Sequence, residues 1–205
     1  MNDKWLSVAM RLQSIAQAGL QYGKDPYDIA RYTELREIAA QLLAERTDLP
    51  PEKIHAVFCN ETGYQTPKLD TRAAVFSEGK ILLVHEADGT WALPGGWCDV
   101  DQSVASNAEK EVLEEAGLRV RAARLIALQD WRLHNVRNYA HGVIKAFVLC
   151  ENLGGAFAEN PETTEARFFE KTALPAELAT QRSSKEQILL CFSAFENPDM
   201  PTQFD

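Results

Sequence analysis

A short helix framed by glycines constrains the fold of this chain more than any other feature of its sequence. Gly95 and Gly96 permit a tight backbone turn, and Ser103 is a suitable residue to cap a helix over 103–116. Gly117 follows that helix and is the residue type that most often ends one. The segment therefore predicts a loop, a helix and a sharp exit at fixed spacings along the chain.

The predicted helix carries three glutamates on one face. Glu111, Glu114 and Glu115 fall at positions i, i+3 and i+4, which are neighbours on a helix surface. Carboxylates this close repel one another, so a cation should neutralise them, and hard oxygen ligands suit Mg²⁺ or Mn²⁺. A solvated acidic face is the alternative explanation. The glycines at fixed spacing on both sides favour the metal site.

Runs of β-branched and aromatic residues predict a sheet on both sides of this helix. The runs TRAAVF and KILLVHE are separated by Glu78-Gly79 and predict a β-hairpin. We expect strands at 71–76, 80–86, 118–131, 141–152 and 167–170, and a closing helix at 184–196. Strands and helices alternate without a regular βαβ repeat, which favours a mixed sheet with helices on its faces. The predicted fold class is α/β.

The N-terminal part of the chain has the pattern of two helices. Apolar residues recur at helical spacing up to Gly19, which is expected to end the first helix. Asp25-Pro26 is a helix start signal, and the second helix is expected to run until Pro50-Pro51. We predict an N-terminal helical domain and linker over 1–66 and a second domain over 67–205.

The predicted helical hairpin has more apolar surface than two helices can bury between themselves. We therefore expect a homodimer in which the N-terminal helices pack on the partner subunit. The alternative is a hairpin that folds back on the second domain of its own chain.

The charge balance restricts the partners of the chain. Lys and Arg number 21 against 30 Asp and Glu, a formal charge of -9, which argues against duplex nucleic acid. No apolar run approaches the roughly 18 to 20 residues that span a bilayer, so we expect no membrane insertion. The N-terminus lacks the continuous apolar core of a signal peptide, and the four cysteines are widely spaced, without a CxxC. We predict reduced thiols and a cytoplasmic location.

The segment from Gly96 to Leu118 resembles the box of the Nudix hydrolase family, Gx5Ex7REUxEExGU, in which U is a bulky apolar residue. The matching positions after Gly96 are Glu111, Val112, Glu114, Glu115, Gly117 and Leu118. Gln102 replaces the first glutamate of the box and Lys110 replaces its arginine, two residues that mainly support the loop and helix in the family. The resemblance implies the α/β/α sandwich of Nudix proteins with its mixed sheet, here preceded by the helical hairpin.

The resemblance also implies roles for individual residues. Glu111 and Glu115 would be the principal ligands of Mg²⁺ or Mn²⁺, with Glu114 assisting and the Gly95 carbonyl completing the site. Bound metal ions would polarise the P–O bonds of a diphosphate and lower the pKa of an attacking water. The candidates for the general base are Glu111 itself and Glu162, which lies in a polar loop. The predicted catalytic residues are thus Glu111, Glu115 and Glu162.

Further segments suggest a substrate class. CNETGYQTPKLDTRAAVF, WALPGGWCDV and ETTEARFFEKTALP look like the Nudix subfamily with an added N-terminal helical domain, which includes CDP-choline pyrophosphatases. This likeness implies hydrolysis of CDP-choline to CMP and phosphocholine, with ADP-ribose as the alternative and a short RNA left open as substrate. A Nudix-like binding or regulatory module is the alternative from another class, because two box residues are replaced.

Four residues are candidates for contact with such a substrate: Arg72, Trp97, Trp131 and His134. Arg72 is expected near a diphosphate, although a salt bridge to Asp70 or Glu86 explains it equally well. Trp97 follows the Gly-Gly turn, where an indole can stack on a base or meet choline by a cation–π contact; core packing is the alternative. Trp131 and His134 are expected at the end of a strand, lining the nucleotide pocket, and the alternative for His134 is a surface or satisfied histidine.

Overall fold

The computed structural model describes residues 4–45, 54, 59, 62–135, 141–158 and 160–205. The chain forms two compact units. The first contains the described residues of Met1–Pro67 and Asn138–Gly142, and the second those of Lys68–Arg137 and Val143–Asp205. None of the described helices is both long enough and apolar enough to span a membrane.

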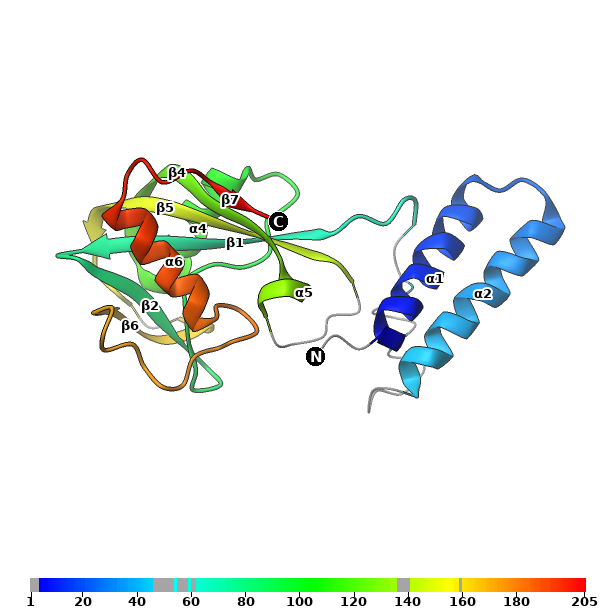
Figure 1. Ribbon diagram of the computed structural model, residues 1–205, viewed down its shortest axis with the longest axis horizontal. Helices are drawn as coiled ribbons and strands as arrows, with labels where there is room; N and C mark the ends of the chain where they lie inside the picture. Colours follow the sequence, from blue (N-terminus) through cyan, green and yellow to red (C-terminus); the bar gives the residue numbers. More distant parts are fainter. Residues whose placement is uncertain (1–3, 46–53, 55–58, 60–61, 136–140, 159) are drawn as a thin grey trace. The chain divides into compact units, whose positions relative to one another are not determined.

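The first unit contains the predicted helical hairpin, α1 (Lys4–Tyr22) and α2 (Pro26–Ala44), shown in blue in Figure 1. The side chain of Asp25 caps α2, because its Oδ1 accepts hydrogen bonds from the backbone amides of Tyr27 and Asp28 at 2.9 and 3.1 Å. Leu6 and Ala9 of α1 pack with Ala39, Ala40 and Leu43 of α2 in a small apolar core. The start signal read from Asp25-Pro26 is thus confirmed.

The prediction that Gly19 ends the first helix is wrong. Helix α1 continues to Tyr22, and Gly19 faces Tyr32 of α2. A Cβ atom at position 19 would lie 2.4 Å from ring atoms of Tyr32. The glycine therefore serves helix–helix packing rather than termination. Helix α2 ends at Ala44, and the Pro50-Pro51 stop lies outside the described residues.

The second unit is built on a seven-stranded sheet. Its strands are β1 (Lys68–Ser77), β2 (Lys80–Glu86), β3 (Trp91–Ala92), β4 (Leu118–Asp130), β5 (Val143–Gly155), β6 (Thr163–Phe169) and β7 (Gln203–Phe204). The order is β3-β2-β1-β5-β4-β7, with β6 paired to β2. β1 pairs with β5 in parallel and with β2 antiparallel, so the sheet is mixed and the predicted β-hairpin is confirmed.

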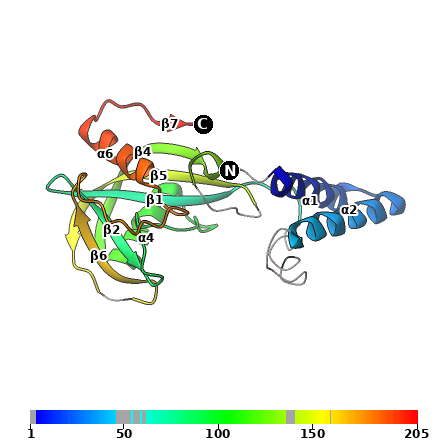
Figure 2. The ribbon, with the colours of Figure 1, turned by 60° about the horizontal axis from the view of Figure 1, so that its bottom comes forward.

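Helices α4 (Val104–Ala116) and α6 (Lys185–Glu196) cover opposite faces of this sheet, as Figures 1 and 2 show. The alternation of β1 divides the core. Ala73 and Val75 pack in the cluster that includes Val112 of α4, whereas Ala74 and Phe76 pack in the cluster that includes residues of α6. The predicted α/β/α sandwich with a mixed sheet is confirmed.

The strand expected over 118–131 ends one residue earlier, and Trp131 and His134, which were expected at its end, follow it directly. Both residues belong to α5 (Trp131–His134), a single helical turn. The side chain of Asp130 caps this turn by accepting a hydrogen bond of 3.0 Å from the Arg132 amide. The closing helix was expected over 184–196, and Ser184 is its N-cap.

Candidate active site

The Gly95-Gly96 turn lies along β1 and is hydrogen-bonded to it. The amide of Thr71 donates to the Gly96 carbonyl at 2.8 Å, and the amide of Ala73 donates to the Pro94 carbonyl at 2.9 Å. Gly95 has a φ of +143°, and a Cβ atom there would lie 2.0 Å from the carbonyl oxygen of Thr71. Only glycine permits this approach, so the turn is fixed against the central strand of the sheet.

A buried asparagine ties this loop to helix α4. The Nδ2 of Asn107 donates to Thr71 Oγ1 at 2.7 Å and to the Trp97 carbonyl at 3.3 Å, and its Oδ1 accepts from the Asp99 amide at 3.2 Å. Asn107 is completely buried. Sequence reasoning missed it, although its position four residues before Glu111 and eight before Glu115 places it on their helix face.

Helix α4 begins and ends as its sequence predicts. Ser103 is the N-cap and forms a reciprocal capping box with Ser106. Gly117 ends the helix in the left-handed conformation, with a φ of +67°. Between these boundaries Ala108 and Val112 are buried in the core cluster on β1, which fixes the rotation of the helix about its axis.

That rotation directs two of the three predicted carboxylates at the Gly95-Gly96 turn. The amide of Gly95 donates a hydrogen bond of 2.8 Å to Oε2 of Glu115. A Cβ atom on Gly96 would lie 3.0 Å from Oε2 of Glu111, so this carboxylate faces the second glycine. Glu111 and Glu115 are both buried. The N–H of Gly95 faces Glu115, and the role of its carbonyl as a metal ligand stays a prediction.

Burial makes these carboxylates costly to ionise. Desolvation raises the pKa of Glu115 to about 8, although the positive charge of Arg72 and the Gly95 hydrogen bond oppose it. Desolvation also raises the pKa of Glu111, against the effect of Lys110. A bound cation would favour the charged form of both groups.

Glu114 does not join this pair. Its side chain is 56% exposed and forms an ion pair of 3.2 Å with Lys110, whose Nζ also lies 3.0 Å from Asp99 and 3.5 Å from Glu111. Hydrogen bonds to Asp99 and Glu114 raise the pKa of Lys110 above its ordinary value. The lysine that replaces the arginine of the box thus still connects the helix to the loop.

The carboxylates of this site fit a divalent cation that also takes ligands from water and substrate. Among the described residues, no three His, Cys, Asp or Glu side chains are grouped so that they could hold a metal ion. Mg²⁺ commonly binds through one or two carboxylates together with waters and substrate phosphates. Glu111 and Glu115 are two such carboxylates, because both are buried and both have raised pKa values. The role of Glu114 as an assisting ligand stays a prediction.

Arg72 is buried behind the acidic pair. Its Nε and Nη2 donate to the Asp70 carboxylate at 2.7 and 3.0 Å, and its Nη1 donates to the Leu93 carbonyl at 3.3 Å. The structure thus forms the Asp70 salt bridge that was the alternative to a diphosphate contact. The charge of Arg72 also lowers the pKa of Glu111 and Glu115, which partly offsets their burial.

Asp70 has a second cationic partner that sequence reasoning missed. The Nζ of Lys145, a fully buried residue of β5, donates to Asp70 Oδ2 at 3.3 Å and to the Arg182 carbonyl at 2.9 Å. Desolvation lowers the pKa of Lys145 to about 8, with Asp70 opposing. This buried network connects β1 to the loop that precedes α6.

A further buried carboxylate, Glu86, was also missed as a site residue. It ends β2, is 5% exposed and forms an ion pair with Arg182. Desolvation raises its pKa, and its charge in turn contributes to the raised pKa of Glu115. Glu86 lines a pocket of about 430 Å³ together with Ala87, Asp88, Glu162 and Arg182.

The loop that carries Glu162 is attached to the end of α4. The Oγ1 of Thr163 donates a hydrogen bond of 2.6 Å to the carbonyl oxygen of Glu115. The Oδ1 of Asn160 accepts from the amides of Glu162 and Thr163 at 3.0 and 2.9 Å. Glu162 is exposed and lines the pocket beside Glu86. The structure thus holds the predicted base in a loop adjacent to Glu115.

The predicted aromatic and histidine contacts have different surroundings. Trp97 is 45% exposed directly after the turn, where a substrate can reach it. Trp131 is 2% exposed at the start of α5. Nε2 of His134 lies 2.9 Å from Oδ1 of Asp205, so the alternative of a satisfied histidine describes it. The roles of Trp131 and His134 in substrate binding stay predictions.

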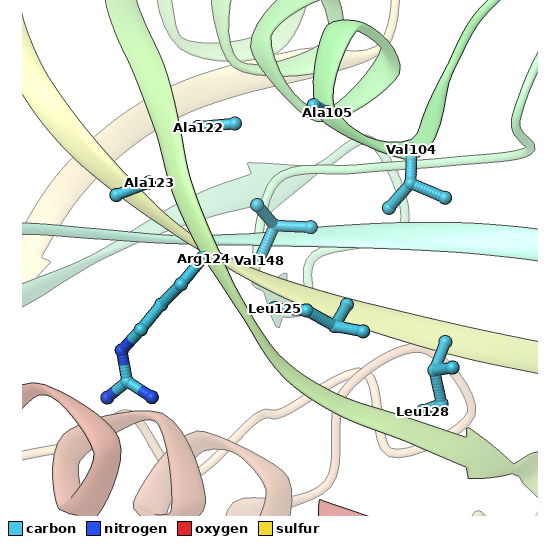
Figure 3. Close-up of a pocket in the computed structure, with 8 residues that line it drawn as sticks. All are labelled: Val104, Ala105, Ala122, Ala123, Arg124, Leu125, Leu128 and Val148. Carbon is cyan, nitrogen blue, oxygen red and sulfur yellow. The ribbon is translucent and has the colours of Figure 1, made fainter. Parts of the chain in front are cut away.

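A second pocket has the wrong chemistry for a diphosphate. It measures about 340 Å³ and is lined by Val104, Ala105, Ala122, Ala123, Arg124, Leu125, Leu128 and Val148. Its single charged residue is Arg124, whose guanidinium donates to carbonyls of Ala194, Asn197 and Met200 near the end of α6. Figure 3 shows this side chain directed toward α6 and away from Val104 and Leu128.

Comparison with known proteins decides the family. Residues 66–190 match the NUDIX domain. The chain belongs to the Nudix hydrolase family. The predicted family and enzyme class are therefore confirmed, and the fold described above is that of a Nudix protein. Residues 3–58 match a domain described as UDP-X-like, N-terminal oligomerisation domain.

Relatives of this Nudix hydrolase match over two thirds of the chain or more. A Bacillus subtilis protein named "Putative ADP-ribose pyrophosphatase YjhB" is 39% identical over 206 residues, which cover 100% of this chain and 99% of that protein. A crystal structure of a UDP-X diphosphatase shares 32% identity with a TM-score of 0.65 and covers 98% of both chains. An ADP-ribose pyrophosphatase from Streptococcus suis shares 52% identity with a TM-score of 0.64, over 68% of this chain and 100% of that one.

Proposed function

We propose that this Nudix hydrolase cleaves the diphosphate of a nucleoside diphosphate linked to a second moiety. The observation that carries the proposal is the placement of two buried carboxylates, Glu111 and Glu115, against the Gly95-Gly96 turn. Burial raises the pKa of both acids, so a cation bound between them and the glycine loop would favour their charged forms. A diphosphate supplies the remaining oxygen ligands of such a cation.

Glu111 and Glu115 would hold the cation, which we propose to be Mg²⁺ or Mn²⁺. When bound, such an ion polarises the P–O bonds and lowers the pKa of an attacking water. The Gly95 amide orients Glu115 through its hydrogen bond, and Asn107 keeps the loop at a fixed distance from α4. The Gly95 carbonyl and Glu114 are the further ligands that the family resemblance implies.

Glu162 is the proposed general base. Its loop is hydrogen-bonded to the last turn of α4, because Thr163 Oγ1 donates to the Glu115 carbonyl, and Glu162 itself is exposed and lines the pocket that contains Glu86. A base must accept the proton of the attacking water within hydrogen-bond reach, and such assistance is typically worth about 10² to 10⁴ in rate. Glu111 itself is the alternative base.

CDP-choline is the substrate that the sequence resemblance favours. The pocket that Glu162 lines also contains Glu86 and Asp88, and these carboxylates would attract the quaternary ammonium of choline, whereas Arg182 in the same lining would attract a phosphate. ADP-ribose is a second candidate, because two relatives carry the name ADP-ribose pyrophosphatase and a third is called a UDP-X diphosphatase. Trp97, Trp131 and His134 are the proposed contacts on the substrate side. The Arg72 contact stays a prediction, because its guanidinium is bonded to Asp70 and to the Leu93 carbonyl.

The test is hydrolysis of a panel with Mg²⁺ or Mn²⁺ and with EDTA, measured by release of phosphate after phosphatase coupling. The panel contains CDP-choline, ADP-ribose, a UDP-sugar, NADH and a short RNA. Preferential and EDTA-sensitive cleavage of CDP-choline supports the full proposal. Cleavage of another nucleoside diphosphate derivative keeps the reaction and replaces the substrate. No hydrolysis across the panel would favour the binding module instead.

We further propose a homodimer formed through α1 and α2. The match of residues 3–58 to an oligomerisation domain supports it, and so do the exposed apolar side chains of Trp5, Ile15 and Ile38 on these helices. A cytoplasmic location stays a prediction, consistent with four free cysteines.

A further inference from the structure

One cation lines the pocket that contains Glu162, whose loop is hydrogen-bonded to the Glu115 carbonyl through Thr163. Glu86, Asp88 and Glu162 supply carboxylates, Ala87 is apolar, and Arg182 supplies the guanidinium. A guanidinium is always charged and presents a planar set of donors that matches phosphate oxygens. A diphosphate that enters this pocket therefore meets a suitable donor at one position only.

We propose that Arg182 is a substrate-binding residue and that its guanidinium contacts the diphosphate of the substrate. This inference rests on the proposed function, because it assigns Arg182 to the reaction described above. Arg182 lies outside the Nudix box, in the loop between β6 and α6.

The other cations near the acidic pair are already engaged. The guanidinium of Arg72 is 4% exposed and bonded to Asp70 and Leu93. The ammonium of Lys110 is shared among Asp99, Glu111 and Glu114. Arg182 differs from both, because its side chain is 38% exposed and its ion-pair partner within the described part of the chain is Glu86. It is thus the cation of the site best able to accept a new anionic partner.

The backbone of Arg182 is held firmly. Its carbonyl accepts the hydrogen bond of 2.9 Å from the buried Lys145 ammonium, and its amide donates to the Ala179 carbonyl at 2.7 Å. Ala179 is bonded in turn to Trp91, at the start of the segment that leads to the Gly95-Gly96 turn. Substrate-binding groups contribute most when their support is fixed in advance, and this loop provides such support.

Glu86 determines where the guanidinium lies before substrate binds. The ion pair with this buried carboxylate keeps Arg182 at the pocket wall. The competing explanation is purely structural, namely that Arg182 only neutralises the buried charge of Glu86. If so, removal of the Glu86 charge should repair the loss of Arg182, whereas a phosphate contact cannot be restored in this way.

The experiment measures binding of inorganic pyrophosphate, in the presence of Mg²⁺, to the full chain by titration calorimetry. We compare the wild type with Arg182→Gln, with the double variant Arg182→Gln/Glu86→Gln and with Arg182→Lys. Arg121→Gln is the matched control, because Arg121 is an exposed arginine paired with one carboxylate, Glu151, outside the pocket. Circular dichroism verifies that each variant is folded.

We expect the dissociation constant to rise about tenfold or more in both the single and the double variant, because charge-assisted hydrogen bonds are lost. Arg182→Lys should give a smaller loss, and Arg121→Gln should bind within twofold of the wild type. The inference is overturned if Arg182→Gln binds within twofold of the wild type, if Glu86→Gln restores binding, or if the wild type does not bind pyrophosphate.

Turnover of the best panel substrate separates this inference from the proposed function. If the wild type hydrolyses the substrate and Arg182→Gln raises KM with kcat changed less, both stand. If the wild type hydrolyses nothing while pyrophosphate binding still requires Arg182, the proposed function fails and the anion site stands. If hydrolysis proceeds with pyrophosphate binding independent of Arg182, the function stands and this inference fails.

Discussion

The amide of Gly95 donates a hydrogen bond of 2.8 Å to Oε2 of Glu115, a buried carboxylate on the adjacent helix. This contact joins the two parts of the site, the glycine turn beside β1 and the acidic face of α4. Glycine is required at position 95 for a separate reason, because a side chain there would collide with the Thr71 carbonyl. The backbone of one loop therefore positions the proposed metal-binding pair.

Stability without metal should depend on pH through Glu115. Its pKa is about 8 in the folded chain, above the ordinary 4.5, so between these values the folded state binds more protons than the unfolded state. The free energy of unfolding should therefore fall as pH rises from about 5 to 8, by about 2 to 4 kcal/mol. Urea unfolding in EDTA at a series of pH values measures this free energy.

Glu115→Gln is the control for this pH dependence. Glutamine cannot ionise, so the variant should lose most of the fall, and the part that persists should come from Glu111 and Glu86, whose pKa values are also raised. A wild-type stability that rises with pH over this range would contradict the assignment of burial as the dominant effect.

Removal of the Asn107 amide should destabilise the second unit. Asn107→Ala takes away three hydrogen bonds to Thr71, Trp97 and Asp99 and leaves buried polar groups unpaired. We expect a loss of about 2 to 3 kcal/mol in the free energy of unfolding, measured with urea. Asn152→Ala, which removes one exposed contact to Gly154, should cost less than about 1 kcal/mol. Equal losses would argue against a clamp at Asn107.

Glu162→Gln should lower kcat at least about tenfold, because the proposed base is removed, with Mg²⁺ affinity unchanged. Steady-state kinetics and Mg²⁺ titration measure the two quantities separately. Glu165→Gln is the neighbouring control, since Glu165 is a partly exposed glutamate paired with Arg167 on β6. Activity of Glu162→Gln within twofold of the wild type would remove this residue from the mechanism.

The N-terminal helices should hold two copies of the chain together. Sedimentation at micromolar concentration should give twice the chain mass of 22.9 kDa. Replacement of Ile15 and Ile38 by Glu should shift the chain toward monomer, because both exposed apolar side chains would then be charged. Leu153→Glu, an exposed position in the second unit, should leave the mass unchanged. A wild-type monomer would end this proposal.

Local signals allowed much of the fold to be predicted from sequence. Ser103 and Gly117 set the bounds of α4 through their own chemistry, and the structure matches both. The prediction for Gly19 was wrong because this glycine makes room for Tyr32 of the next helix. A local sequence pattern does not reveal a contact between two helices. The two-residue strands β3 and β7 were missed for the same reason, since they exist only through pairing with distant segments.

The site was predictable where one helix supplies it. Spacing along α4 identified Glu111 and Glu115. The same spacing grouped Glu114 with them, but in the structure the Glu114 carboxylate forms an ion pair with Lys110. Glu86 and Arg182 lie 96 positions apart and meet only in the folded chain. Asp130 before Trp131 was a helix-capping signal that could have revealed α5.

The role of Glu115 in a metal-dependent hydrolysis is tested most directly by ³¹P NMR. The wild type and Glu115→Gln are each assayed with the best panel substrate, in Mg²⁺ and in EDTA. Glu151→Gln, an exposed glutamate outside the site, is the control. We predict cleavage of the diphosphate by the wild type and the control in Mg²⁺, none in EDTA, and a rate for Glu115→Gln lower by about 10² or more, the scale of a lost group that stabilises charge at the reacting centre. Undiminished cleavage by Glu115→Gln, or cleavage that persists in EDTA, would contradict the account.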